Sequence, residues 1–296
     1  MSFTAAEVAG LVREACTRRD LDPTGLRLVH HYSSAVCVLP VEDVVARLTL
    51  GETPEQVTAT QTIVAHLGDR GVPVTAPHAT ATAVEVHGAV VSFWEHYPQP
   101  HPTRPLTSRE LAGALKVLHG APSPPLPLVT WTPLVSAEAT LRHHRDSAHI
   151  TSGEIDALLA RIDAVRIELA ALDYPCGHGL IHGDAWAGNL LWRGDTPVLG
   201  DWDWVAYGPR EVDLIPTWHA ATRYGKGRGW AEAFAAEYGV DLTGWSGFAA
   251  MLRMRDLVQL SGPLKRAAHS PTHAAVLRQR VNGILGNDTA SVWTAL

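Results

Sequence analysis

The stretch of chain that decides the fold runs from Leu180 to Leu214 and reads LIHGDAWAGNLLWRGDTPVLGDWDWVAYGPREVDL. In it Asn189 follows Asp184 by five residues, Asp201 comes twelve residues later, and Asp203 follows two residues after that. Apolar pairs flank these polar residues, and they are Leu180-Ile181, Leu190-Leu191 and Val198-Leu199. We expect the apolar pairs to be anchored in a core, so that the loops between them project the Asp and Asn side chains into a cleft.

These side chains are suited to phosphoryl transfer. Carboxylate and amide oxygens are the ligands that Mg²⁺ prefers, often shared with substrate phosphates. A carboxylate that binds no metal can accept the proton of an attacking hydroxyl. Because phosphoryl transfer needs mainly positioning and charge neutralisation, an Asp, an Asn and a second Asp on adjoining loops supply its parts. The structural alternative is that they only form turns and caps, which Asp and Asn also favour.

The same stretch closely resembles the Brenner motif and metal-binding segment of the aminoglycoside phosphotransferase family, which shares the protein-kinase-like fold. The residues that carry the resemblance are His182-Gly183-Asp184, Asn189 and Asp201-Trp202-Asp203. The resemblance implies that Asp184 is the catalytic base or orients the acceptor, and that Asn189 and Asp201 hold Mg²⁺. It further implies that Asp203 assists at a second metal or is structural, and that Asp213 braces the catalytic loop by hydrogen bonds.

Weaker similarities extend over most of the chain. FWEHYP, ending at Pro98, looks like the hinge whose backbone contacts adenine, and its residues are Phe93, Trp94, Glu95, His96 and Tyr97. HYSSAV, which contains Ser33 and Ser34, sits where the family has its nucleotide-covering loop, although it lacks glycine. The segment 108–122 is similar to the helix that follows the hinge. The resemblance thus implies binding of ATP, with GTP as an alternative.

One position departs from the family pattern. The family has a lysine or comparable cation on the third strand, paired with a Glu on the next helix, and this chain has no lysine before Lys116. Arg47 takes the place, and its guanidinium can bind phosphate with two hydrogen bonds. Thr60 and Gln61 stand about where the Glu is expected, and Glu55 is an earlier candidate. The structural alternative for Arg47 is a surface ion pair with Glu42 or Glu52.

The pattern along the chain predicts an α+β, two-lobed protein-kinase-like fold. Four helix starts are indicated by a threonine followed three residues later by Glu or Gln, at Thr4, Thr53, Thr107 and Thr151. Short β-prone runs fill the first hundred residues, and Gly88 divides one of them into a predicted hairpin. We expect residues 1–97 to form a small nucleotide-binding lobe with an antiparallel sheet, and residues 98–296 a larger, mainly helical lobe that binds the acceptor.

Composition excludes several classes of function. The net charge is −6, and no basic face typical of nucleic-acid binding is indicated. No apolar run is long enough for a transmembrane helix, and charged residues interrupt the N-terminal segment where a signal peptide is apolar, so we expect a cytoplasmic protein. The three cysteines, Cys16, Cys37 and Cys176, are far apart, which supports neither a disulfide framework nor a zinc site.

The sequence therefore predicts an Mg²⁺-dependent kinase that transfers the γ-phosphoryl group of ATP or GTP to a hydroxyl of an antibiotic or metabolite. A choline, amino-alcohol or sugar kinase of the same fold is one alternative, and a non-catalytic nucleotide-binding module is another. For the acceptor site, acidic residues could converge and favour a cationic substrate; they are Glu211, Glu232, Glu237 and Asp241. Basic residues near the last helices favour an anionic or neutral one instead; they are Arg253, Arg255, Lys265 and Arg266. Trp186 and Trp218 are candidate pocket walls.

Overall fold

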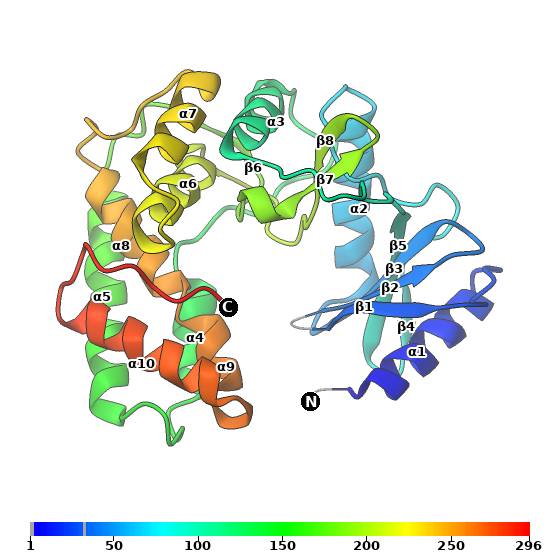
Figure 1. Ribbon diagram of the computed structural model, residues 1–296, viewed down its shortest axis with the longest axis horizontal. Coiled ribbons are helices and arrows are strands. Elements are labelled where there is room, and N and C mark those ends of the chain that lie inside the picture. The colour runs from blue at the N-terminus through cyan, green and yellow to red at the C-terminus, as the bar shows by residue number, and fades with distance from the viewer. Residues whose placement is uncertain (1–2, 32–33) are drawn as a thin grey trace. The chain divides into compact units, whose positions relative to one another are not determined.

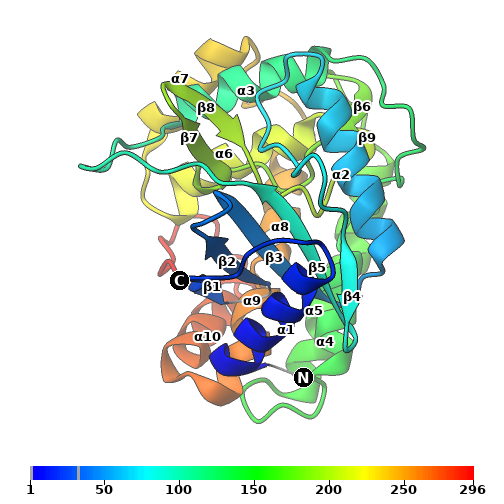
Figure 2. The same ribbon diagram turned by 90° about the vertical axis from the view of Figure 1, so that its right-hand side faces the viewer.

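The computed structural model describes residues 3–31 and 34–296, and Figures 1 and 2 show it as a ribbon in two views. By internal packing the chain forms two compact units. Unit 1 comprises Met1–Leu106, Gly120–Leu128 and Asn189–Val205, and unit 2 comprises Thr107–His119, Val129–Gly188 and Ala206–Leu296. The assignment of residues 1–97 to nucleotide binding and of residues 98–296 to acceptor binding stays a prediction.

Unit 1 is built on a five-stranded antiparallel sheet with the strand order β1-β2-β3-β5-β4. Its strands are β1 (Arg27–His31), β2 (Ala35–Leu39), β3 (Val44–Leu50), β4 (Val84–Val86) and β5 (Ala89–Glu95). The hairpin predicted at Gly88 is confirmed between β4 and β5. His87 and Gly88 have φ angles of 50° and 79°, which is the left-handed pair that a two-residue hairpin turn requires.

Two helices cover opposite faces of this sheet, α1 (Ala5–Thr17) and α2 (Pro54–Gly68). Val91 of β5 belongs to the large core that α1 buries, whereas its neighbour Val90 packs against Val57 of α2. Because successive side chains of a strand point to opposite faces, one strand supplies both layers of the core.

The four predicted helix starts are confirmed. The helices begin directly after the expected caps, at Ala5, Pro54, Ser108 and Ser152. At Thr4, Thr53 and Thr151 the threonine hydroxyl accepts a hydrogen bond from the backbone amide of the residue three positions later. The side chain of that later residue in turn accepts a hydrogen bond from the threonine backbone amide. At Thr107 the amide donates to the Glu110 carboxylate at 2.8 Å. These reciprocal bonds satisfy amides that a helix start otherwise leaves without partners.

A later segment of the chain completes unit 1. Strands β7 (Leu190–Arg193) and β8 (Thr196–Leu199) form an antiparallel hairpin. The Thr75 amide donates to the Leu199 carbonyl at 2.9 Å, and the Leu199 amide donates to the Pro73 carbonyl at 2.8 Å. These bonds explain why residues 189–205 pack with unit 1 although its sheet ends much earlier in the sequence, at Glu95.

Unit 2 is mainly helical (Figure 1). Its helices are α3 (Ser108–Gly120), α4 (Val135–His143), α5 (Ser152–Ala170), α6 (Glu211–Arg223), α7 (Arg228–Tyr238), α8 (Phe248–Val258), α9 (Ser261–Arg266) and α10 (Pro271–Leu285), with the short 3₁₀ turn η2 (Ala267–His269). Strands β6 (His178–Ile181) and β9 (Ala206–Pro209) pair antiparallel. Among residues 3–31 and 34–296, no helix combines the length and apolar character that a membrane span needs.

Candidate active site

The loop that carries Asp184 follows strand β6 in unit 2. Leu180 and Ile181 at the end of β6 are buried, as the apolar pattern predicts. The chain then turns through Gly183, whose φ of 85° favours glycine, and reaches the short 3₁₀ turn η1 (Ala187–Asn189). The apolar strand end therefore fixes the base of the loop in the core.

Asp213 of α6 braces this loop from its buried side. Its carboxylate, fully buried, accepts hydrogen bonds from the amides of His182 at 2.6 Å and Gly183 at 2.8 Å. It also accepts from His119 Nε2 of α3 at 3.0 Å. Burial alone would raise the pKa of Asp213, but the hydrogen bonds and charge of His119 and the bonds from the loop lower it. The bracing role that the resemblance implies for Asp213 thus has its hydrogen bonds in the structure.

Asp184 itself is partly exposed, with 32% of its side chain accessible. Its amide donates to His182 Nδ1 at 3.3 Å, and the His182 side chain is fully buried. His182 therefore braces the loop from within the core. The Asp184 carboxylate accepts a hydrogen bond from Arg255 Nη2 at 2.7 Å, a contact that no spacing in the sequence indicates.

The residues expected to hold Mg²⁺ lie in unit 1, around the ends of the β7–β8 hairpin. The Gly200 amide donates to the Asn189 carbonyl at 2.8 Å, which ties the two ends together. Asp201 follows with a φ of 62°, a left-handed conformation that is uncommon for a residue other than glycine and is concentrated at functional sites. Trp202 is buried, and its Nε1 donates to the Leu199 carbonyl at 2.9 Å. Trp202 therefore packs inward and anchors the turn.

Arg47 of β3 pairs with these two carboxylates. Its guanidinium contacts Asp201 at 3.1 Å and makes two hydrogen bonds with Asp203. The ion-pair partners of Arg47 are therefore Asp201 and Asp203, and not Glu42 or Glu52 as in the structural alternative. Burial alone would lower the pKa of Arg47, but the hydrogen bonds and charge of Asp203, together with Asp201, raise it, so the guanidinium stays charged. The side chain is 17% exposed.

The family's lysine–glutamate arrangement is altered accordingly. Gln61, at the expected Glu position, is buried and donates from Nε2 to the Phe93 carbonyl at 3.0 Å. It therefore links α2 to β5. Glu55 is exposed at the start of α2, where its carboxylate is favoured by the first turn of the helix.

The donor set in unit 1 fits a magnesium ion. Two carboxylates, Asp201 and Asp203, converge on one guanidinium, and the Asn189 amide stands at the start of the same hairpin. Oxygen ligands of this kind suit Mg²⁺. In the part of the chain that the structure describes, no three His, Cys, Asp or Glu side chains are gathered as metal ligands. This set would therefore need Asn189, nucleotide phosphates or water to complete the coordination.

The expected hinge follows β5 in unit 1. The Phe93 carbonyl accepts from the His78 amide at 3.0 Å, and the Glu95 and His96 amides donate to the carbonyls of Ala76 and Asp43. The Tyr97 hydroxyl donates to Glu95 at 2.9 Å. Trp94 Nε1 donates to Ser92 Oγ at 2.9 Å. These bonds hold the segment rigidly, and an adenine base would use its remaining backbone groups. Ser34 lies in a bend before β2, and Ser33 lies outside the described residues.

The acidic residues proposed for a cationic acceptor do not form one cluster. Glu211 is fully buried and accepts from the Cys176 amide at 2.6 Å. Glu232 pairs with Arg228 on the surface of α7 at 2.6 Å, and Asp241 accepts from Thr243 in a turn. Helix and turn geometry thus explains Glu232 and Asp241 locally, whereas Glu211 has a distant backbone partner.

The two tryptophans proposed as pocket walls differ in position. Trp218 is buried and packs against Phe248 with the rings edge to face at 5.6 Å, so its assignment as a pocket wall is wrong. Trp186, in the Asp184 loop, is 51% exposed. A side chain at Gly188 would collide with the Trp186 ring at 2.2 Å, so the glycine lets the loop fold under the indole.

A model of the phosphotransferase enzyme family matches residues 33–251 of the chain. The chain belongs to this family. The match spans both the Arg47 strand and the Asp184 loop, so the resemblance seen in the sequence is confirmed. Membership makes the protein a phosphotransferase that acts on hydroxyl groups of small molecules. No curated protein sequence matches the chain significantly.

Solved structures show the family fold. An amicoumacin kinase in complex with AMP-PNP, Ca²⁺ and its antibiotic is 15% identical, with a TM-score of 0.71 and coverage of 98% of both chains. A spectinomycin phosphotransferase bound to ADP and spectinomycin is 14% identical, with a TM-score of 0.64, and the match covers 97% of this chain and 98% of that one. Choline kinase LicA from Streptococcus pneumoniae is 12% identical, with a TM-score of 0.66, and the match covers 95% of this chain and 99% of that one. The α+β kinase-like fold is thereby confirmed.

Proposed function

We propose that this family member transfers the γ-phosphoryl group of ATP, or of GTP, to a hydroxyl of a small antibiotic or metabolite. The observation that carries the proposal is Asp184, held at the end of β6 on a loop braced by the buried Asp213. A carboxylate placed in this way can accept the hydroxyl proton as the acceptor oxygen bonds to the γ-phosphorus and the bond to the leaving nucleoside diphosphate breaks.

The nucleotide would be held by unit 1. Asn189, Asp201 and Asp203 would bind Mg²⁺, which neutralises phosphate charge when it is present. Arg47 would contact the phosphates, and the backbone of residues 93–97 and the loop containing Ser33 and Ser34 would contact the rest of the nucleotide. The proposal includes a cytoplasmic location, where nucleoside triphosphates and Mg²⁺ are available.

The non-catalytic alternative rests on the missing lysine. Arg47 weakens that alternative because it preserves a charged, hydrogen-bonding group beside Asp201 and Asp203. Among acceptors, the relatives of known structure phosphorylate compounds as different as amicoumacin, spectinomycin and choline by name. A panel that spans aminoglycosides, spectinomycin, choline, ethanolamine and amino sugars therefore tests the proposal, with phosphorylated product as the readout.

We predict that Arg47→Gln weakens binding of ATP by about 10- to 100-fold, because a charge-assisted hydrogen bond contributes about 1.5–3 kcal/mol. Calorimetric titration with ATP and with GTP, each with and without Mg²⁺, measures the effect. The matched control is Arg18→Gln, which removes a surface arginine paired with Glu14 in the same unit. Equal affinity of Arg47→Gln and the wild type would remove Arg47 from phosphate binding.

A further inference from the structure

Arg255 is a positively charged residue that contacts the proposed catalytic carboxylate. It lies on α8, and its Nη2 is 2.7 Å from Asp184 Oδ1. The Arg255 side chain is 13% exposed and that of Asp184 is 32% exposed. Hydrogen bonds between a guanidinium and a carboxylate are short and directional, so the contact fixes where one Asp184 oxygen points.

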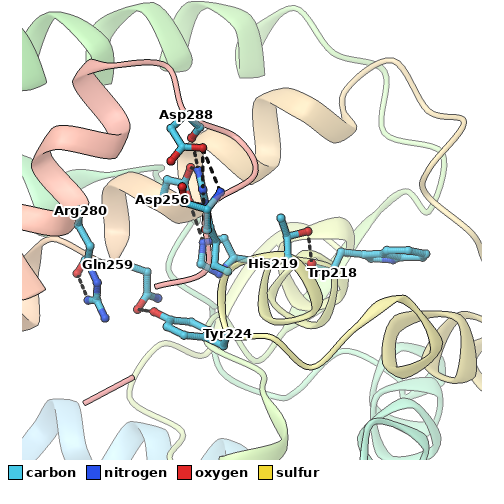
Figure 3. Close-up of polar contacts among 10 residues, drawn as sticks. Trp218, His219, Tyr224, Asp256, Gln259, Arg280 and Asp288 are labelled. Carbon is cyan, nitrogen blue, oxygen red and sulfur yellow. Dashed lines mark hydrogen bonds and ion pairs between the residues drawn. The ribbon is translucent and has the colours of Figure 1, made fainter. Parts of the chain in front are cut away.

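The residue after Arg255 anchors α8 on a different face of the helix. Asp256 is buried and accepts two hydrogen bonds from Arg223 of α6, from Nε at 2.9 Å and from Nη2 at 2.7 Å. His219 Nε2 is also 2.9 Å from Asp256, and the two lie side by side in Figure 3. Burial lowers the pKa of His219, although Asp256 opposes the shift, so the neutral ring donates its Nε2–H to the carboxylate.

The C-terminal segment closes over this ion-pair cluster. Arg223 donates to the backbone carbonyls of Asp288 at 2.5 Å and Ser291 at 3.1 Å. The Trp293 amide donates to the Arg223 carbonyl, and its ring lies 4.4 Å from the guanidinium carbon. The Arg223 guanidinium is only 3% exposed and all its nitrogens donate hydrogen bonds. These bonds, with that of the Trp293 amide, hold α6, α8 and residues 288–293 together.

The two contacts act together because consecutive residues of a helix point about 100° apart. Asp256 locks the rotation and position of α8 against α6, and Arg255 then projects to the Asp184 loop. We propose that Arg255 is a positioning residue for Asp184, and that the buried Asp256–Arg223–His219 cluster holds Arg255 in place. The proposal rests on the proposed phosphotransfer function, in which the placement of Asp184 against the acceptor hydroxyl sets the rate, since small misplacements cost large factors.

The test is steady-state kinetics with ATP and the acceptor from the panel that the wild type phosphorylates best. Arg255→Gln is expected to lower kcat about 10- to 100-fold, as expected for loss of positioning, with the KM for ATP and for the acceptor within about twofold of the wild type. Arg255→Lys, which keeps the charge, should recover part of the loss. The control is Arg145→Gln in the same unit, whose partner is Asp156 on the surface, and its kinetics should match the wild type.

A double-mutant cycle shows whether Arg255 acts through Asp184. In an Asp184→Asn background, Arg255→Gln should cause no further loss of the residual turnover, whereas independent effects would multiply and overturn the proposal. An unchanged kcat in Arg255→Gln, or a raised acceptor KM at unchanged kcat, would overturn it as well. The second of these results would assign Arg255 to acceptor binding.

Hydrogen exchange provides a readout that needs no turnover. Arg255→Gln should raise amide exchange in the loop 182–188 relative to Arg145→Gln, because the loop loses its contact to α8. Unchanged exchange in that loop would overturn the inference. Absence of phosphorylated product with the wild type would instead count against the proposed function, while the exchange result would still decide whether Arg255 holds the loop.

Discussion

Asp184→Asn is expected to lower kcat by about 10²- to 10⁴-fold, the range that a positioned general base contributes. Asparagine keeps the size of the side chain and can still accept from Arg255, but it cannot take up the acceptor proton. Binding of ATP should be retained within about twofold, because the nucleotide residues proposed here lie in unit 1. Initial rates of product formation and calorimetric titration measure the two effects on the same preparation.

The control for this variant is Asp163→Asn, which removes an exposed carboxylate of α5 in the same unit. It should leave both rate and binding unchanged. Turnover of Asp184→Asn at the wild-type rate would remove Asp184 from the mechanism. Loss of ATP binding together with turnover would indicate that the substitution disrupts the fold of the loop instead.

Asp256→Asn is expected to destabilise the protein by about 3–5 kcal/mol, the cost of leaving a buried charge without its partner. Arg223 is 3% exposed, and the carboxylate hydrogen-bonded to it is that of Asp256, whereas the Asp288 carboxylate lies 4.0 Å away. The guanidinium would therefore lose its nearest compensating charge without gaining water. At about 2–4 °C per kcal/mol for a chain of this size, the thermal midpoint should fall by about 10 °C. Scanning calorimetry measures it.

A matched surface pair provides the comparison. Glu168→Gln breaks the ion pair with Arg253, in which both side chains are close to half exposed, and should change the free energy of unfolding by no more than about 1 kcal/mol. The double variant Asp256→Leu with Arg223→Met removes both charges and should recover much of the loss. A midpoint for Asp256→Asn equal to that of Glu168→Gln would contradict the assigned role of the cluster.

The elements that follow local rules could be predicted from the sequence. The threonine caps located four helix starts, and Gly88 located a hairpin, because both depend on neighbours within a few residues. The Asp184–Asn189–Asp201 spacing indicated the family, and the Asp213 brace followed from that resemblance. In these cases the decisive contacts are close in sequence or fixed by a motif.

Long-range partners could not be predicted in this way. Arg47 pairs with Asp201 and Asp203, about 150 residues away, and no periodicity encodes that contact. The pairing of Arg255 with Asp184, and of Asp256 with Arg223, depends on how α8 packs between α6 and the loop that carries Asp184. Trp218 was assigned to a pocket because tryptophan suits both roles, and only its packing against Phe248 shows that it belongs to the core.

The most direct test of the central claim is transfer of the γ-phosphoryl group itself. The purified protein is incubated with ATP or GTP, Mg²⁺ and each hydroxyl compound of the panel, and products are followed by phosphorus NMR and mass spectrometry. The account predicts a phosphorylated product with at least one acceptor, and its loss in Asp184→Asn. Nucleotide binding without transfer to any acceptor would contradict the account and favour a non-catalytic nucleotide-binding module.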